Sequence, residues 1–141
     1  MRASFLFLML VVIALLAGTV GAEGYRVIVN AKNPTSSVDK RFLADAFLKK
    51  RTRWGNDSVI KPVDHTAKSP TRARFTGSVL DRTVAAVRRY WAQVVFSGRG
   101  VAPPEVASDA DVIKYVASNP GAIGYVSADA DVRGVKVLEV K

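Results

Sequence analysis

Cysteine is absent from the 141-residue sequence, and histidine occurs once, as His65. No disulfide or thiolate metal centre can form, so the fold depends on its core alone. No carboxylate–histidine spacing surrounds His65. A serine-protease triad of Asp64, His65 and Ser69 is disfavoured because adjacent residues of an extended backbone point to opposite sides. Since no nucleophile–base pair is visible, the sequence predicts a protein without enzymatic activity, cofactor or metal.

Long apolar runs are missing everywhere except at the start of the chain. Phe5–Ala17 is an unbroken apolar run that follows the cation Arg2 and precedes the small residues of Val20–Ala22. This pattern predicts a secretory signal peptide over residues 1–22 and one domain over residues 23–141. The run is shorter than the ~20 apolar residues of a membrane span, and an uncleaved anchor is the alternative. We therefore expect an exported protein that does not span the membrane after signal cleavage.

Acidic residues are scarce, with 12 Asp and Glu against 21 Lys and Arg and a net charge of +9. Removing residues 1–22 lowers this charge to +8, because Arg2 is the one charged residue among them. The surplus favours anionic partners: phosphate-like ligands, nucleic acid, anionic lipid or envelope polymers. Arg88, Arg89 and Tyr90 interleave cations with an aromatic ring, as single-stranded nucleic-acid sites do. An amphipathic helix with a solvated basic face accounts for them better, so no nucleic-acid partner is expected.

Strands and helices alternate along the predicted domain. Strands are expected over residues 25–30, 59–63, 122–126 and 135–140. Helices are expected from Ser36 to about Leu48, from Ser69 onward, over residues 84–97 and from Ser108 through Val116. This alternation favours an α/β fold built on a layered sheet.

The start of the second predicted helix carries the chemistry of an oxyanion site. Ser69 is a good N-cap and Pro70 suits the first helical position. The hydroxyls of Ser69 and Thr71 and the cations Lys68 and Arg72 gather at this end, where backbone N–H groups are unpaired. An ordinary capped helix with solvated basic residues explains the same pattern equally well.

A second helix start offers a partner wall for such a site. Ser36 begins a Ser-x-x-Asp capping box with Asp39, which places Ser36 and Ser37 at a helix N-terminus that follows a strand. Two helix ends that face one cleft could share an anion. The plainer alternative is that the two serines only cap the helix.

Four ordered segments carry a family resemblance. They are Val27–Asn30 with Asn33–Ser37, Phe47–Trp54, Ile60–Val63 leading to Ser69–Arg72, and Asn119–Val126. Together they resemble the substrate-binding proteins of bacterial phosphate ABC transporters, the PstS-like proteins with a periplasmic-binding-protein-like fold. Short, single-domain members share a stretch like Arg88–Gly100 as well. The resemblance covers nearly all of residues 23–141.

The resemblance implies a periplasmic α/β domain: a three-layer-like single lobe with a mixed sheet and flanking helices. It also implies binding of inorganic phosphate or a similar oxyanion. Relatives hold phosphate with a Ser-Gly-Thr at a helix start, and Ser69 and Thr71 match its serine and threonine. Pro70 replaces the glycine and removes one N–H donor. Relatives carry an arginine where this chain has His65, so His65 is a candidate ligand residue at that position, and Lys68 and Arg72 are the candidate substitutes for the arginine.

The length of the predicted domain matches about one lobe of the two-lobed relatives. The resemblance therefore implies a solute-binding component of phosphate transport, with an ABC permease or a second chain that closes the site as candidate partners. The alternative is a non-transport envelope protein that docks an acidic partner through a basic face of Arg88, Arg89, Arg99 and Lys114.

Overall fold

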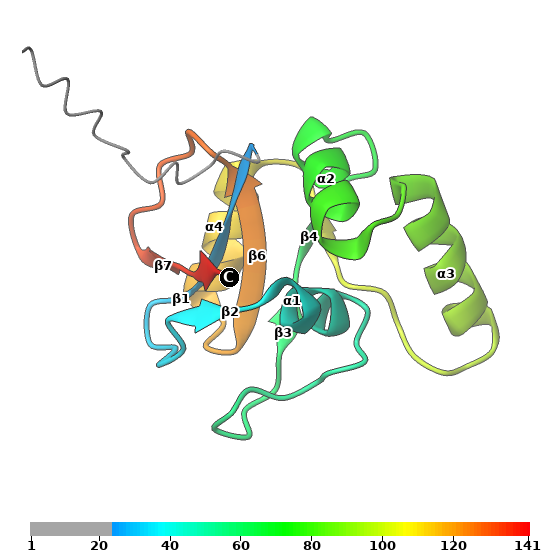
Figure 1. Ribbon diagram of the computed structural model, residues 1–141, viewed down its shortest axis with the longest axis horizontal. Helices are drawn as coiled ribbons and strands as arrows, with labels where there is room; N and C mark the ends of the chain where they lie inside the picture. Colours follow the sequence, from blue (N-terminus) through cyan, green and yellow to red (C-terminus); the bar gives the residue numbers. More distant parts are fainter. Residues whose placement is uncertain (1–23) are drawn as a thin grey trace, which may run out of the picture.

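The computed structural model describes residues 24–141, which form three layers (Figure 1). The predicted signal peptide over residues 1–22 lies outside the described residues. Among the helices of residues 24–141, none combines the length and apolar character needed to cross a bilayer.

The central layer is a four-stranded mixed sheet in the order β3-β6-β1-β7. Its strands are β1 (Tyr25–Asn30), β3 (Lys61–Pro62), β6 (Ala122–Ser127) and β7 (Val135–Val137). The strand β1 runs antiparallel to β6 and β7, whereas β3 runs parallel to β6. The predicted mixed α/β sheet is confirmed.

Both faces of this sheet are covered, which explains why β1 is apolar at successive positions instead of alternating with polar residues. Val27 and Val29 pack on the face covered by α1 (Lys40–Phe47) and α2 (Pro70–Phe75). Ile28 packs on the opposite face against α4 (Asp109–Ser118). The result is a sheet between two helical layers.

The helix α1 begins three residues later than the sequence predicts. Its N-cap is Asp39, whose carboxylate accepts a 2.7 Å hydrogen bond from the N–H of Phe42. Ser37–Val38 instead forms the short strand β2, parallel to β8 (Glu139–Val140). The prediction that Ser36 and Ser37 sit at a helix N-terminus is therefore wrong: their backbone is extended, and the carbonyl of Ser36 accepts from the N–H of Glu139 at 3.0 Å.

The strand predicted over residues 135–140 is divided in two, because its second half pairs with β2 instead of β1. Its first part, β7, pairs with β1, and its second part, β8, pairs with β2. Leu138 lies between the two parts and is buried, and its N–H donates to the carbonyl of Val27 at 2.9 Å.

The long helix predicted over residues 84–97 is confirmed as α3 (Val84–Phe96), capped by the hydroxyl of Thr83. Gly98 ends it with a positive φ of 69°, a conformation that glycine adopts without strain. The following segment, for which the sequence predicts no strand, contains β5 (Glu105–Val106), which pairs in parallel with β4 (Asp64–His65). This pair stands apart from the main sheet and carries the residues discussed below.

The turn that precedes β6 depends on a close backbone contact at Gly121. The indole N–H of Trp54 donates to the carbonyl of Gly121 at 2.9 Å. A Cβ at position 121 would lie 2.0 Å from the carbonyl oxygen of Val59, a distance that only a backbone shift can relieve. Glycine is therefore required here for space.

We expect Gly121→Ala to lower the free energy of unfolding by about 3 kcal/mol or more, because the clash is with backbone that cannot rotate away. Urea denaturation followed by circular dichroism measures this change. Gly77→Ala is the matched control, since a Cβ at position 77 meets nothing within 4 Å. An equal loss in both variants would contradict the steric explanation.

Candidate functional site

The predicted cap of α2 is confirmed. The hydroxyl of Ser69 accepts a 3.2 Å hydrogen bond from the N–H of Arg72, and Pro70 occupies the first helical turn. The N–H of Ser69 donates to the carbonyl of Thr66 at 3.0 Å, which fixes the entry of the chain into the helix. The helix α2 then continues into a π-helical turn, η1 (Thr76–Leu80).

The first turn of α2 has hydrogen-bond donors that no other described residue uses. Within residues 24–141, neither the N–H nor the hydroxyl of Thr71 has a hydrogen-bond partner. Ser69 is half-buried and uses its hydroxyl oxygen as an acceptor, so its hydroxyl proton remains available. Lys68 is exposed beside them. The turn therefore presents donors and a cation, which suits a small anion.

Arg72, which the sequence places at the same anion, directs its guanidinium elsewhere. It is 3% exposed, and its Nη1 pairs with the carboxylate of Glu105 and donates to the carbonyl of His65 at 2.9 Å. Its Nε lies 3.4 Å from Oδ1 of Asp64. The positive charge is thus already matched by two carboxylates, and the side chain joins α2 to β4 and β5.

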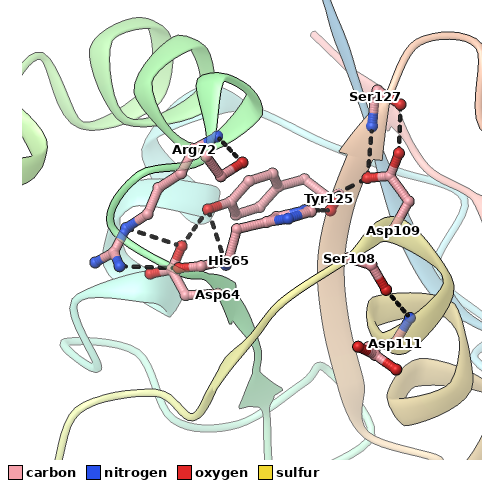
Figure 2. Close-up of polar contacts among 9 residues, drawn as sticks. Asp64, His65, Arg72, Ser108, Asp109, Asp111, Tyr125 and Ser127 are labelled. Carbon is pink, nitrogen blue, oxygen red and sulfur yellow. Dashed lines mark hydrogen bonds and ion pairs between the residues drawn. The ribbon is translucent and has the colours of Figure 1, made fainter.

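The Asp64 carboxylate connects this ion pair to the main sheet (Figure 2). The hydroxyl of Tyr125, on β6, donates to Oδ1 of Asp64, and the ring of Tyr125 stacks on Phe75 with centroids 3.9 Å apart. The ring of His65 is buried, and its Nε2 lies 2.8 Å from the carbonyl of Tyr125. Because a carbonyl only accepts, Nε2 must carry a proton and donate.

The buried positions of these groups shift their pKa values. Burial raises the pKa of Asp64, and the nearby Arg72 guanidinium and the Tyr125 hydroxyl oppose this in part. Burial and the adjacent Asp64 carboxylate raise the pKa of Tyr125 well above its usual value. Tyr125 is therefore a permanent hydrogen-bond donor at any physiological pH.

The structure brings together only some of the residues that the sequence proposes for one site. Lys68, Ser69 and Thr71 share the first turn of α2, whereas His65 is buried in β4. Ser36 and Ser37 lie at β2 and face the C-terminal strand β8 through their backbone.

Sequence reasoning missed the carboxylates that hold Arg72. Asp64 was considered only as a triad member, and nothing local to Arg72 marks Glu105, which is 33 residues away. The one available signal was the placement of an acidic residue, Asp64, at the end of an apolar strand, where burial calls for a partner. Within residues 24–141, no group of His, Asp and Glu could hold a metal ion.

Several solved structures resemble this fold, and they include proteins described as phosphate receptors. An ABC-type phosphate transport receptor from Vibrio cholerae matches with a TM-score of 0.64 and 22% identity, over 83% of this chain and 46% of that chain. A putative phosphate ABC transporter substrate-binding protein with bound phosphate from Clostridium perfringens matches with a TM-score of 0.64 and 22% identity, over 83% and 44%. PstS from Borrelia burgdorferi matches with a TM-score of 0.64 and 14% identity, over 84% and 47%.

The TM-scores establish a shared fold despite the low identities, and the predicted periplasmic-binding-protein-like lobe is confirmed. The chain spans less than half the length of each of these three proteins. No protein-family model matches the chain, and no curated protein matches it in sequence. The chain therefore has an α/β fold similar to about one half of each of these solved substrate-binding proteins.

We expect Arg72→Met to lower the free energy of unfolding by about 3 kcal/mol, because it leaves the Asp64 carboxylate buried without its cation. Chemical denaturation of the single variant and of Arg72→Met combined with Asp64→Asn tests this cause. The double variant should recover part of the loss, since no buried charge remains. A double variant as unstable as the sum of both single variants would contradict the pairing.

Because the pKa of Asp64 is raised in the folded protein, the contribution of Asp64 to the free energy of unfolding should depend on pH with a defined sign. The folded state holds the Asp64 proton more tightly than the unfolded state, so this contribution to stability is full below about pH 4 and is lost as pH rises through the folded-state pKa. The unfolding free energy of the wild type minus that of Asp64→Asn should therefore decrease as the pH rises from about 4 toward neutrality. Urea titrations across this range measure the difference, and a difference that grows with pH would refute the raised pKa.

Proposed function

We propose that this chain is a non-catalytic binding module for inorganic phosphate or a related oxyanion, and that the anion binds at the first turn of α2. The observation that carries the proposal is the set of unused donors on Thr71 at a capped helix start. The similar fold of phosphate receptors, one of them described with bound phosphate, supports it.

Three residues would contact the anion directly. Thr71 offers its N–H and hydroxyl, Ser69 offers its hydroxyl proton, and Lys68 supplies the mobile charge. Arg72 would act as a positioning residue, because its ion pairs fix the orientation of α2 while its guanidinium stays with Asp64 and Glu105. We leave His65 out of the direct contacts because its ring is buried and bonded to Tyr125.

Lys68 is exposed and Ser69 half-buried, whereas Thr71 is 8% exposed, so the site is only partly shielded from water and its affinity alone should be modest. Charge-assisted hydrogen bonds contribute about 1.5–3 kcal/mol when shielded from water, but exposed charge pairs contribute only ~0–1 kcal/mol each. A second chain or lobe that covers the first turn of α2 would exclude water and raise the affinity. Within this proposal the chain acts in the periplasm as the solute-binding part of phosphate transport, with such a chain or an ABC permease as partner.

A hollow next to α3 is a poorer place for an anion. It is lined by Asp64, Arg72, Arg88, Trp91 and Glu105, together with Ala102 and Pro103. Two carboxylates face this hollow, and they would repel an oxyanion that approached the buried guanidinium of Arg72.

The alternative of an envelope protein docked through one basic face has less support. Arg88, Arg89 and Arg99 belong to α3 and its exit, whereas Lys114 lies on α4, which covers the far face of the main sheet (Figure 1). These four residues therefore do not form one surface, and the similar solved structures are substrate-binding proteins.

Titration calorimetry with inorganic phosphate at low ionic strength tests the proposal. We expect saturable one-site binding, with sulfate competing because the first turn of α2 offers hydroxyl and N–H donors beside a cation, and no carboxylate that would select a protonated oxyanion. Thr71→Val should weaken binding about tenfold or more, as the loss of one charge-assisted hydrogen bond would, and Lys68→Gln, which removes an exposed charge, should weaken it up to about fivefold.

Two exposed residues elsewhere provide matched controls. Thr52→Val and Lys61→Gln make the same chemical changes away from α2 and should leave phosphate affinity unchanged. A flat phosphate titration of the folded protein, or equal losses in the control variants, would refute the proposed site.

A further inference from the structure

The exit of α3 carries an unusual concentration of exposed apolar side chains. Phe96 is 95% exposed, Val101 66% and Val95 51%. Among residues 24–141, the one other large apolar side chain exposed to this degree is Val59, at 48%. Exposed apolar side chains that gather at one place commonly mark a contact surface.

The same segment is purely basic. Residues 82–104, which we call the α3 arm, contain four arginines and no aspartate or glutamate. Arg88 and Arg89 are exposed, and within the described chain neither has a carboxylate partner. Within the described residues, the side chain of Arg99 donates only to the hydroxyl of Ser97, at 2.8 Å. The cations of the arm are therefore available to an external anion.

Helical geometry places exposed apolar side chains of α3 on the same side as its arginines. Arg89 and Phe96 are seven residues apart in α3, as are Arg88 and Val95, so each pair lies on the same side of the helix. The buried stripe of Val87, Trp91 and Val94 occupies another side.

The arm is attached to the body of the protein along that buried stripe and at its C-terminal end, where the carbonyl of Pro104 accepts from the N–H of Asp64 at 2.9 Å. Its three buried residues pack with Leu80 and Tyr90, and the hydroxyl of Tyr90 reaches the carbonyl of Leu48 at 3.4 Å. Figure 1 shows α3 at the end of the molecule opposite β7. The outer face of α3, with its apolar exit, is thus unobstructed by the rest of the described chain.

We propose that the α3 arm docks on an anionic phospholipid bilayer. Phe96, Val95 and Val101 would enter the boundary between headgroups and acyl chains, while Arg88 and Arg89 would contact lipid phosphates. Helices with an apolar edge and a cationic face lie at membrane interfaces in this way. The arm itself carries four arginines and no acidic residue, a charge that anionic lipid attracts.

A bilayer suits this surface better than an acidic protein does. The apolar side chains stand out from a helix end that projects from the fold, and a protein partner would need a matching pocket to bury them. Lipid adapts to a projecting side chain without such a pocket. This proposal concerns a different surface from the first turn of α2, so it does not depend on anion binding there.

The absence of cysteine allows a site-specific test in the full chain. Phe96→Cys creates a unique attachment point for an environment-sensitive fluorophore, and Val59→Cys gives a matched label at an exposed apolar position outside the arm. Each labelled protein is mixed with vesicles of phosphatidylcholine alone or of phosphatidylcholine with phosphatidylglycerol. The label at position 96 should shift to the blue only with the phosphatidylglycerol vesicles, and the label at position 59 should not shift.

Charge removal then tests the role of the arginines. Arg88→Gln with Arg89→Gln, in the position-96 labelled chain, should weaken the vesicle affinity roughly 30-fold, as expected for two cations near an anionic surface. Lys32→Gln with Lys61→Gln removes two exposed cations outside the arm and should change the affinity several times less.

Three results would overturn the proposal. They are no shift at position 96, an equal shift with neutral vesicles, and an equal shift with soluble polyglutamate in the absence of lipid. The last result would assign the arm to an acidic protein partner instead. The readout reports on position 96 itself, so contact between another part of the chain and the vesicle does not produce it.

Discussion

The structure depends on one buried guanidinium. Arg72 leaves α2 and lies between Asp64 and Glu105, so it ties a helix to the small parallel pair β4–β5. Asp64 in turn accepts from Tyr125 in the central sheet, where the tyrosine ring stacks on Phe75 of the same helix. A charge buried to this extent is tolerated only with such partners, and the partners fix the position of α2 relative to the sheet.

The sequence assigns anion binding to Arg72 together with Ser69 and Thr71, but the structure gives Arg72 the different task of holding α2 in place. Arg72 holds the helix, and the donors of Ser69 and Thr71 remain free at the helix start. An oxyanion bound there would meet a turn whose direction is already set, at no further cost in ordering the backbone. It would not gain the Arg72 charge, which is why we expect modest affinity from this lobe without a covering partner.

Local signals predicted much of the fold. The apolar run of β1, the hydroxyl caps of α2 and α4, and the glycine stop after α3 each act within a few residues, and the structure follows them. The start of α1 could not be predicted with equal success, because Ser36 and Asp39 are both competent caps and pairing with the distant strand β8 decides between them. The role of Arg72 was hidden for a similar reason, since Glu105 approaches it only through the folded chain.

The central claim is that the first turn of α2 binds an oxyanion while Arg72 stays with its carboxylates. Heteronuclear NMR of the ¹⁵N-labelled protein during a phosphate titration tests it most directly. The account predicts that the backbone amide of Thr71 shifts saturably, that the amides of Arg88 and Arg89 do not, and that the Arg72 Nε–H resonance changes little. Shifts that spread over the arginines of α3, or a large change at Arg72 Nε–H without one at Thr71, would contradict it.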